Sequence, residues 1–253
     1  MKNDNPSILS VTNLSVSFSS KKSFFKRRTF DSVLTNVNLE LFKGKITALV
    51  GESGSGKTTI GNSFVGLIRD FEGEFKFKGE AYDPLRMEHL RSDIQYIFQD
   101  SLSALNPRKN IGSTIEEVLL VHQSDETLKI LLDQVQLSNS IAKKYPHQLS
   151  GGQRQRVNIA RALAVDPLVL ICDEIVSSLD VSVQAKILNL INSLIRERKL
   201  SILFITHDLN VVKSFADYII VIHGGRIVET GEAQKILQRP VNNYTKKLIA
   251  IIQ

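Results

Sequence analysis

Cysteine is almost absent from this sequence, since Cys172 is the only one in 253 residues. A single thiol cannot form an internal disulfide, which excludes a small disulfide-stabilised domain and is consistent with a reducing compartment. Long apolar runs are also missing: residues 168–172 and 218–222 fall far short of the roughly 20 residues that cross a bilayer. No charged segment leading into an apolar stretch opens the chain, so we expect no secretory signal. Internal repeats and low-complexity linkers are lacking too, which excludes a repeat architecture.

The composition is typical of a globular protein. Apolar residues make up 42% and charged residues 23% of the chain, whose length suits one large α/β domain or two small ones. The formal net charge is +6, and part of the excess lies in a basic segment with Lys21, Lys22, Lys26, Arg27 and Arg28. This segment is either a solvated loop or a surface that attracts phosphates of a nucleotide, a lipid or a nucleic acid. Because the segment does not place aromatic stacking residues on a recognisable RNA- or DNA-binding motif, we expect no nucleic-acid partner.

Residues 51–58 read Gly-Glu-Ser-Gly-Ser-Gly-Lys-Thr and match the phosphate-binding pattern G-x-x-x-x-G-K-[ST]. The glycines permit close approach of the backbone, so that N–H groups at the start of the next helix can surround phosphates. Lys57 would reach the outer phosphates, and the Thr58 hydroxyl would contact Mg²⁺. A glycine turn with a solvated lysine is the alternative, which the complete pattern disfavours. The residues predicted to bind a nucleoside triphosphate are Gly51, Glu52, Ser53, Gly54, Ser55, Gly56, Lys57, Thr58 and Thr59.

Strand and helix patterns alternate around this loop. We predict strands at 8–18, 33–42, 45–50, 169–172, 201–206 and 218–222, several short strands within 71–98, and helices at 58–68, 151–164, 183–195 and over most of 112–149. Residues 19–32 are predicted to be a polar loop. Strands that alternate with helices indicate an α/β fold with a mostly parallel sheet covered on both faces.

Two carboxylates, Asp173 and Glu174, close the apolar run 168–172. At the end of a buried strand one carboxylate can hold Mg²⁺ through water, and its neighbour can act as general base toward an attacking water. Acidic residues at strand ends are common on surfaces, so the pair is informative because of the phosphate-binding loop upstream. Gln99 and His207 also follow predicted strands, at the edge of a parallel sheet where ligands bind, although each alone could be an ordinary residue. We predict catalytic roles for Glu174, His207 and Gln99, and Mg²⁺ binding by Thr58, Gln99 and Asp173.

A second glycine motif opens the predicted helix 151–164. Its N–H groups could form another anion site, or the motif could simply cap the helix. A helical segment separates this motif from the phosphate-binding loop, so a head-to-tail pair of subunits would let one subunit's motif cover the nucleotide on the other. The residues predicted to act in this way are Leu149, Ser150, Gly151, Gly152 and Gln153.

These motifs, in this order and over nearly the whole chain, resemble the nucleotide-binding subunit of ATP-binding cassette (ABC) transporters. Residues 51–58 are similar to the Walker A loop, Gln99 to the Q-loop, 149–153 to the signature and 168–173 to Walker B. The resemblance also equates Glu174 with the catalytic glutamate, His207 with the switch histidine, and 177–180 with the D-loop, whose Asp180 would link the two sites of a dimer. Phe18 falls where the family stacks an aromatic ring on adenine, although Phe24, Phe25 or Phe30 could serve instead.

The resemblance implies a single ABC ATPase domain spanning 1–253, with ATP and Mg²⁺ as cofactors. It implies an α/β fold with a P-loop NTPase core and a mostly parallel sheet, an N-terminal antiparallel β subdomain, and an α-helical signature subdomain at about 100–165 inserted within the core. One departure from the family is Ile175, where a proline usually follows the catalytic glutamate.

Three further segments narrow the resemblance to importers of dipeptides, oligopeptides and nickel. These are 99–108, 145–148 and 180–184, and the Asn-Pro-Arg of the first is most similar to the second ATPase of such systems. Peptide-importer ATPases often continue past Tyr244-Thr245 into a longer tail with a cysteine cluster, which this sequence lacks. At that end it resembles the shorter nickel or metal-chelate members, so we expect no iron–sulfur cluster.

The function implied by the resemblance is an ATP-hydrolysing subunit that energises a bacterial importer of peptides, nickel or metal-chelate complexes. Its expected partners are a second ATPase subunit in a heterodimer, two membrane permease subunits and an extracytoplasmic substrate-binding protein. Its expected place is the cytoplasmic face of the cell membrane, as a peripheral subunit. The alternative is a non-transport ABC ATPase in DNA repair or on ribosomes, disfavoured because there is one cassette and no heptad or zinc-module insertion. An exporter subunit is disfavoured by the segment that follows Gln99.

Overall fold

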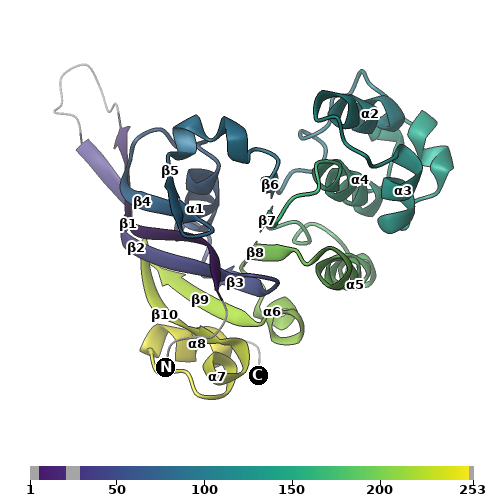
Figure 1. Cartoon of the computed structure of the whole chain (residues 1–253). Helices are drawn as coiled ribbons and strands as arrows, with labels where there is room; N and C mark the ends of the chain where they lie inside the picture. The colour runs from purple at the N-terminus through teal and green to yellow at the C-terminus, as the bar shows by residue number, and fades with distance from the viewer. Residues whose placement is uncertain (1–5, 21–28, 251–253) are drawn as a thin grey trace. The chain divides into compact units, whose positions relative to one another are not determined.

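An antiparallel sheet is formed by the first strands of the chain (Figure 1). The computed structural model describes residues 6–20 and 29–250, so the basic residues from Lys21 to Arg28, with Phe24 and Phe25, lie outside the described residues. Two compact units make up the chain, Met1–Glu88 with Ser201–Gln253 and His89–Leu200. The predicted helical segment at about 100–165 falls within the second unit.

The antiparallel sheet belongs to the first unit and has the order β2-β1-β4-β5. Its strands are β1 (Ser7–Ser20), β2 (Thr29–Phe42), β4 (Phe71–Phe77) and β5 (Glu80–Tyr82). The predicted loop at 19–32 is wrong at both ends, because Ser17 to Ser20 pair with residues 32 to 29 of β2. These residues lack an apolar alternation, and Ser17, Phe18, Asp31 and Ser32 are exposed. A ladder of backbone hydrogen bonds does not require apolar side chains at exposed positions.

The first unit also contains parallel strands, in the order β10-β9-β3-β8. They are β3 (Ile46–Val50), β8 (Ser201–Thr206) and β9 (Tyr218–His223), with β10 (Arg226–Glu232) antiparallel to β9. Every residue of β3 and β8 is buried, as expected for apolar strands of a parallel sheet. Val50 is level with Thr206 on one side and Val221 on the other, so these strands end at one edge.

Helices of the first unit follow these strands. They are α1 (Lys57–Phe64), α6 (Leu209–Phe215), α7 (Ala233–Gln238) and α8 (Asn243–Ala250), with the 3₁₀ turn η1 (Pro84–Arg86). A further 3₁₀ turn, η2 (Glu88–Leu90), begins at the last residue of this part of the first unit and continues into the second unit. Helix α1 ends four residues before the predicted boundary at 68. Gly66 has a φ of +68°, and Leu67 N donates to Asn62 O at 3.0 Å, which closes the helix in a glycine-type C-terminal motif.

The second unit holds a pair of parallel strands and most of the helices. Its elements are β6 (Ile94–Ile97), β7 (Val169–Asp173), α2 (Ile111–Val121), α3 (Leu128–Gln134), η3 (Asn139–Lys143), η4 (Pro146–Gln148), α4 (Gly151–Leu163) and α5 (Val181–Arg198). The predicted helical stretch 112–149 is divided into separate helices, because Asn110, Thr127 and Ser138 each cap a new start with a side-chain oxygen.

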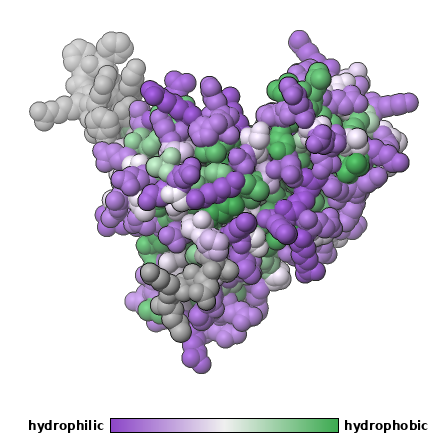
Figure 2. Space-filling view, in the orientation of Figure 1, coloured by the Kyte–Doolittle hydropathy of each residue, from purple (hydrophilic) through white to green (hydrophobic). Residues whose placement is uncertain are grey.

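The expected α/β fold is confirmed, with an antiparallel N-terminal sheet, mostly parallel strands elsewhere and a helix-rich second unit. Hydrophilic residues cover most of the face shown in Figure 2, with hydrophobic residues exposed in places. Of the described residues, Leu120 and Val121 near the end of α2 are 80% and 70% exposed. No helix in the described ranges combines the length and the apolar character needed to cross a membrane.

Candidate nucleotide-binding site

The phosphate-binding loop runs from the end of β3 to the start of α1, as predicted. Gly56 has a φ of +103°, a conformation that side chains other than glycine rarely adopt. A Cβ at Gly51 would lie 2.3 Å from the carbonyl oxygen of Ile222, so only glycine fits there. The backbone geometry therefore requires glycine at two of the predicted positions, and Gly51 lies close to β9.

Inside the loop, Lys57 is 5% exposed and its Nζ donates to the carbonyl oxygens of Gly51 at 2.9 Å and Glu52 at 2.8 Å. Ser55 is also buried, and its Oγ has no hydrogen-bond partner among the described residues. A buried hydroxyl without a partner usually has an additional ligand or water to bind. A buried ammonium, a spare hydroxyl and the N–H groups at the start of α1 fit a phosphate chain.

His207 directly follows β8 and is exposed. Because Thr206 is level with Val50, His207 and the phosphate-binding loop leave the same edge of the parallel strands. The next residue, Asp208, caps α6 with its side chain and its N–H donates to Thr206 Oγ1 at 3.0 Å. The first unit thus brings His207 and the loop together at the edge where open α/β sheets bind ligands.

In the second unit, β7 delivers Asp173 to the end of a fully buried strand. The carboxylate is 3% exposed, and Tyr96 on the neighbouring strand β6 donates from Oη to Asp173 Oδ2 at 2.9 Å. Burial, followed by the proximity of Asp173, raises the pKa of Tyr96 well above its ordinary value, so this hydroxyl remains a donor. Burial also raises the pKa of the adjacent Cys172 thiol to about 12.

Gln99 and Glu174 meet in the same unit. Ile97 and Cys172 are level in the parallel pair, and Gln99 Nε2 donates to Glu174 Oε2 at 3.3 Å. Glu174 has a φ of +47°, which is uncommon outside glycine, and Ser177 supports this turn by donating from N and Oγ to the Glu174 carbonyl at 3.2 and 2.9 Å. Ile175, which replaces the family's usual proline, is buried. Two residues predicted to be catalytic are therefore in contact.

The second glycine motif forms the N-terminus of α4. Ser150 accepts from Gln153 N at 3.3 Å and donates its own N–H to Gln153 Oε1 at 3.0 Å, a reciprocal capping box. A Cβ at Gly152 would lie 2.5 Å from Val183 Cγ1, so glycine is needed where α4 approaches α5. Gly151 likewise faces Leu179, which places this motif beside the segment that ends in Asp180.

Asp180 caps α5, accepting from Val183 N at 3.0 Å and from Ser182 Oγ at 2.7 Å. The preceding turn is anchored by Gln184, whose Nε2 donates to the carbonyl oxygens of Val176 and Leu179, each at 3.0 Å. Asp180 therefore occupies a rigid turn whose local role is that of a helix cap.

Phe18 lies in β1, where its backbone is level with Asp31 of β2, and its ring is 46% exposed. Of the alternatives to Phe18 for stacking on adenine, Phe24 and Phe25 fall outside the described residues. Phe30 is in β2, level with Ser19. The exposed ring of Phe18 is compatible with stacking.

The family profile described as "ABC transporter" matches residues 34–177 of the chain. These residues include the phosphate-binding loop, the second glycine motif and the carboxylate pair. This chain belongs to the ABC transporter family.

Relatives of this ABC protein carry names of import systems. It is 42% identical over 255 residues to the glutathione import ATP-binding protein GsiA of Pectobacterium atrosepticum, an alignment that covers 97% of this chain and 41% of that protein. It is 40% identical over 262 residues to the oligopeptide transport ATP-binding protein OppF of Streptococcus mutans, covering 100% of this chain and 83% of that protein. The chain thus spans about two fifths of the GsiA relative.

A solved ABC cassette has the same fold. The dimeric structure of the ATP-binding cassette MJ0796 in a post-hydrolysis state, bound to ADP and Pi, superposes with a TM-score of 0.76 at 27% identity. The match covers 89% of this chain and 99% of that chain. The P-loop fold inferred from the sequence is therefore confirmed.

Within this ABC fold, two contacts were not predicted from the sequence. Tyr96 was assigned only to a short apolar strand, and its hydrogen bond to Asp173 has no motif to mark it. Tyr244 Oη accepts a hydrogen bond from the N–H of Glu52, in the Walker A loop, at 3.2 Å. The signal that could have indicated Tyr96 is its position in the strand that precedes Gln99.

Proposed function

We propose that this chain is the ATP-hydrolysing subunit of a bacterial ABC importer for peptides, nickel or metal-chelate complexes. The observation that carries ATP binding is the loop with a buried Lys57 ammonium and a buried Ser55 hydroxyl that lacks a protein partner. Import is supported by the relatives, whose printed names refer to glutathione import and oligopeptide transport. These names favour peptides, and nickel and metal chelates are the other cargoes to be tested.

In the proposed cycle, the loop N–H groups and Lys57 hold the phosphates, and the Phe18 ring stacks on adenine. Thr58, Asp173 and Gln99 would hold Mg²⁺, which neutralises phosphate charge when bound. The hydroxyl, carboxylate and amide that this requires are present, and Tyr96 orients Asp173.

Glu174 is the proposed general base, accepting a proton from the attacking water. Gln99 contacts this carboxylate, so it can orient both the base and the water. His207 would contact the γ-phosphate side of the site. Ser177 donates to the backbone carbonyl of Glu174 and so stabilises the turn that carries the proposed base.

A second ATPase subunit completes the proposed site. Ser150, Gly151 and Gly152 of one subunit would cap the γ-phosphate bound by the other, and Asp180 would link the two sites. We propose a heterodimer at the cytoplasmic face of the cell membrane, working with two permease subunits and an extracytoplasmic binding protein. Gln99 and the helical part of the second unit are the proposed contacts with the permeases.

Glu174→Gln tests the chemistry. It should preserve ATP binding while hydrolysis by the purified chain falls at least about 100-fold, the usual contribution of a general base. The exposed Glu74 on β4 provides a matched control, Glu74→Gln, which should hydrolyse ATP at the parent rate. Hydrolysis near the parent rate in Glu174→Gln would show that another group is the base.

Lys57→Ala tests binding and cargo together. Calorimetry should show weaker ATP binding than in the parent and in the control Lys76→Ala, whose side chain is exposed on β4. Cells carrying Lys57→Ala should lose uptake of labelled short peptides, of nickel or of chelated transition metals. Unchanged uptake of all three, in cells without a second transporter for them, would contradict the import function.

A further inference from the structure

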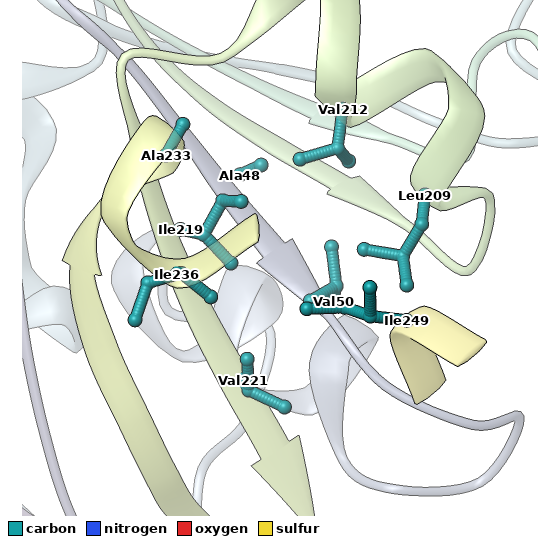
Figure 3. Packing of buried hydrophobic residues seen from close by; sticks show 9 residues of the cluster. All are labelled: Ala48, Val50, Leu209, Val212, Ile219, Val221, Ala233, Ile236 and Ile249. Carbon is teal, nitrogen blue, oxygen red and sulfur yellow. The ribbon is translucent and has the colours of Figure 1, made fainter. Parts of the chain in front are cut away.

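The C-terminal helix α8 has no part in the proposed cycle, yet one of its residues contacts the phosphate-binding loop. Ile249 of α8 is buried in one cluster with Val50 and Leu209, and Figure 3 shows these three side chains close together. Val50 is the last residue before the phosphate-binding loop, and Leu209 comes two residues after His207. One side chain of α8 therefore belongs to the same buried cluster as residues next to both segments that the first unit contributes to the site.

A hydrogen bond joins the same helix to the loop itself. Tyr244 Oη accepts from Glu52 N–H at 3.2 Å, while the Tyr244 ring stacks on His223 with centroids 3.9 Å apart and planes at 27°. His223 is the last residue of β9, next to the Ile222 carbonyl that Gly51 approaches. The ring is thus fixed by β9 and its hydroxyl is directed at the loop.

The peptide group between Gly51 and Glu52 is held from both sides. In a trans peptide the C=O and the N–H point in opposite directions. The N–H of this group donates to Tyr244 Oη, and its C=O, on Gly51, accepts from Lys57 Nζ at 2.9 Å. Rotation of this one peptide would therefore disturb both the tyrosine and the lysine that is proposed to bind phosphate.

The start of α8 is itself anchored. Glu229 on β10 accepts from Val241 N at 2.8 Å and from Asn242 N at 3.0 Å, and Asn242 Oδ1 accepts from Tyr244 N at 2.8 Å. This chain of hydrogen bonds runs from β10 to Tyr244 without involving the loop. The position of the Tyr244 hydroxyl is consequently set by the C-terminal fold and not by the loop that it contacts.

We propose that α8 braces the phosphate-binding loop, and that Tyr244 is a positioning residue that holds the Gly51–Glu52 peptide in the orientation that binds ATP. The inference rests on the proposed ATP binding and adds the C-terminal segment to the determinants of nucleotide affinity. Without the Tyr244 acceptor, the peptide can rotate, and the Gly51 carbonyl no longer holds Lys57 in place.

Tyr244→Phe tests this inference, because it keeps the ring on His223 and removes only the acceptor. The dissociation constant for Mg-ATP, measured by calorimetry on the full chain, should rise about two- to tenfold, the usual worth of one hydrogen bond. In steady state, KM for ATP should rise while kcat stays near the parent value. Amide exchange at Glu52, followed by NMR without nucleotide, should accelerate. Tyr218→Phe, at the opposite end of β9, is the matched control and should change none of these quantities.

The opposite results are equally informative. If Tyr244→Phe binds Mg-ATP like the parent and Glu52 exchange is unchanged, the inference is overturned. If only Tyr244→Ala loses affinity, the ring acts by packing and the hydroxyl does not position the loop. A parent chain that fails to bind Mg-ATP would overturn the proposed function as well, whereas loss of the Tyr244 effect alone leaves that function intact. Circular dichroism melts of each variant show whether it is folded.

Discussion

Tyr96→Phe would remove one hydrogen bond from the carboxylate at the end of β7. In the parent, Tyr96 Oη donates to Asp173 Oδ2 at 2.9 Å, and Asp173 is buried. A hydrogen bond to a charged group contributes roughly 1.5–3 kcal/mol to stability. Because Asp173 has other interactions as well, we expect the free energy of unfolding to fall by about 1.5 kcal/mol, the lower end of that range.

The same change should weaken Mg²⁺ binding. A hydrogen-bonding partner that orients a ligating carboxylate is typically worth about 10- to 100-fold in metal affinity. We therefore expect the Mg²⁺ concentration that half-saturates ATP binding to rise at least about tenfold in Tyr96→Phe. Unfolding in urea is best followed by circular dichroism, because the chain has no tryptophan.

Tyr82→Phe is the matched control for this prediction. Tyr82 Oη also donates a hydrogen bond within the fold, to the carbonyl oxygen of Phe64 at 3.1 Å, but that acceptor is neutral and lies on α1. Its loss should lower stability by about 1 kcal/mol and leave the Mg²⁺ requirement unchanged. Equal Mg²⁺ requirements in the parent, Tyr82→Phe and Tyr96→Phe would refute the argument that Tyr96 orients a metal ligand.

The pH dependence provides an independent readout. Burial and Asp173 raise the pKa of Tyr96 in the folded chain above the value of about 10 in the unfolded chain. The stabilisation linked to this shift is therefore complete below pH 10 and is lost as the pH rises further. The unfolding free energy of Tyr96→Phe should fall less steeply above pH 10 than that of the parent.

Gly152→Ala should lower stability by about 1–3 kcal/mol, because its Cβ would lie 2.5 Å from Val183 Cγ1, and Val183→Ala in the same chain should restore part of the loss in urea unfolding. Cys172 is buried and burial raises its pKa to about 12, so a thiol reagent at pH 8 should leave the native chain unlabelled and label it once urea has unfolded it; rapid native labelling would contradict the burial. The hydrogen bond from the Ser182 side chain, and to a smaller extent the one from Val183 N, lowers the pKa of Asp180 in the folded chain. The contribution of this shift to the free energy of unfolding is therefore present above about pH 4 and is lost as the pH falls. Asp180→Asn keeps an equally good cap and should flatten that part of the acid-unfolding curve, which an unchanged curve would contradict.

The strands in which every residue is buried were the simplest to predict. In β3, β7 and β8 every residue is buried, so an unbroken apolar run was a sufficient signal. Residues 226–250 were left unassigned. There β10 is a partly exposed edge strand, and α7 and α8 have only 6 and 8 residues, too few to show a helical period.

Motifs located the predicted site residues, but not the side chains that hold them. Parallel register explains why the motif residues converge within each unit: Val50 is level with Thr206, and Ile97 with Cys172. The contacts of Tyr96 with Asp173 and of Tyr244 with Glu52 span 77 and 192 residues. Since tyrosine serves as core, surface and hydrogen-bonding residue alike, no local pattern distinguishes these two from the others.

The second glycine motif shows that two readings of one pattern can both hold. From the sequence, residues 149–153 were either a helix cap or an anion site. The structure shows the cap, in which Ser150 and Gln153 exchange side-chain and backbone hydrogen bonds. That exchange uses the N–H groups of Ser150 and Gln153, whereas the first two helical N–H groups belong to Gly151 and Gly152. A capping box leaves those two donors to point out of the helix end, where the macrodipole also favours negative charge. The cap therefore orients the very N–H groups that binding a partner subunit's γ-phosphate would require, and it does not compete with that proposed role.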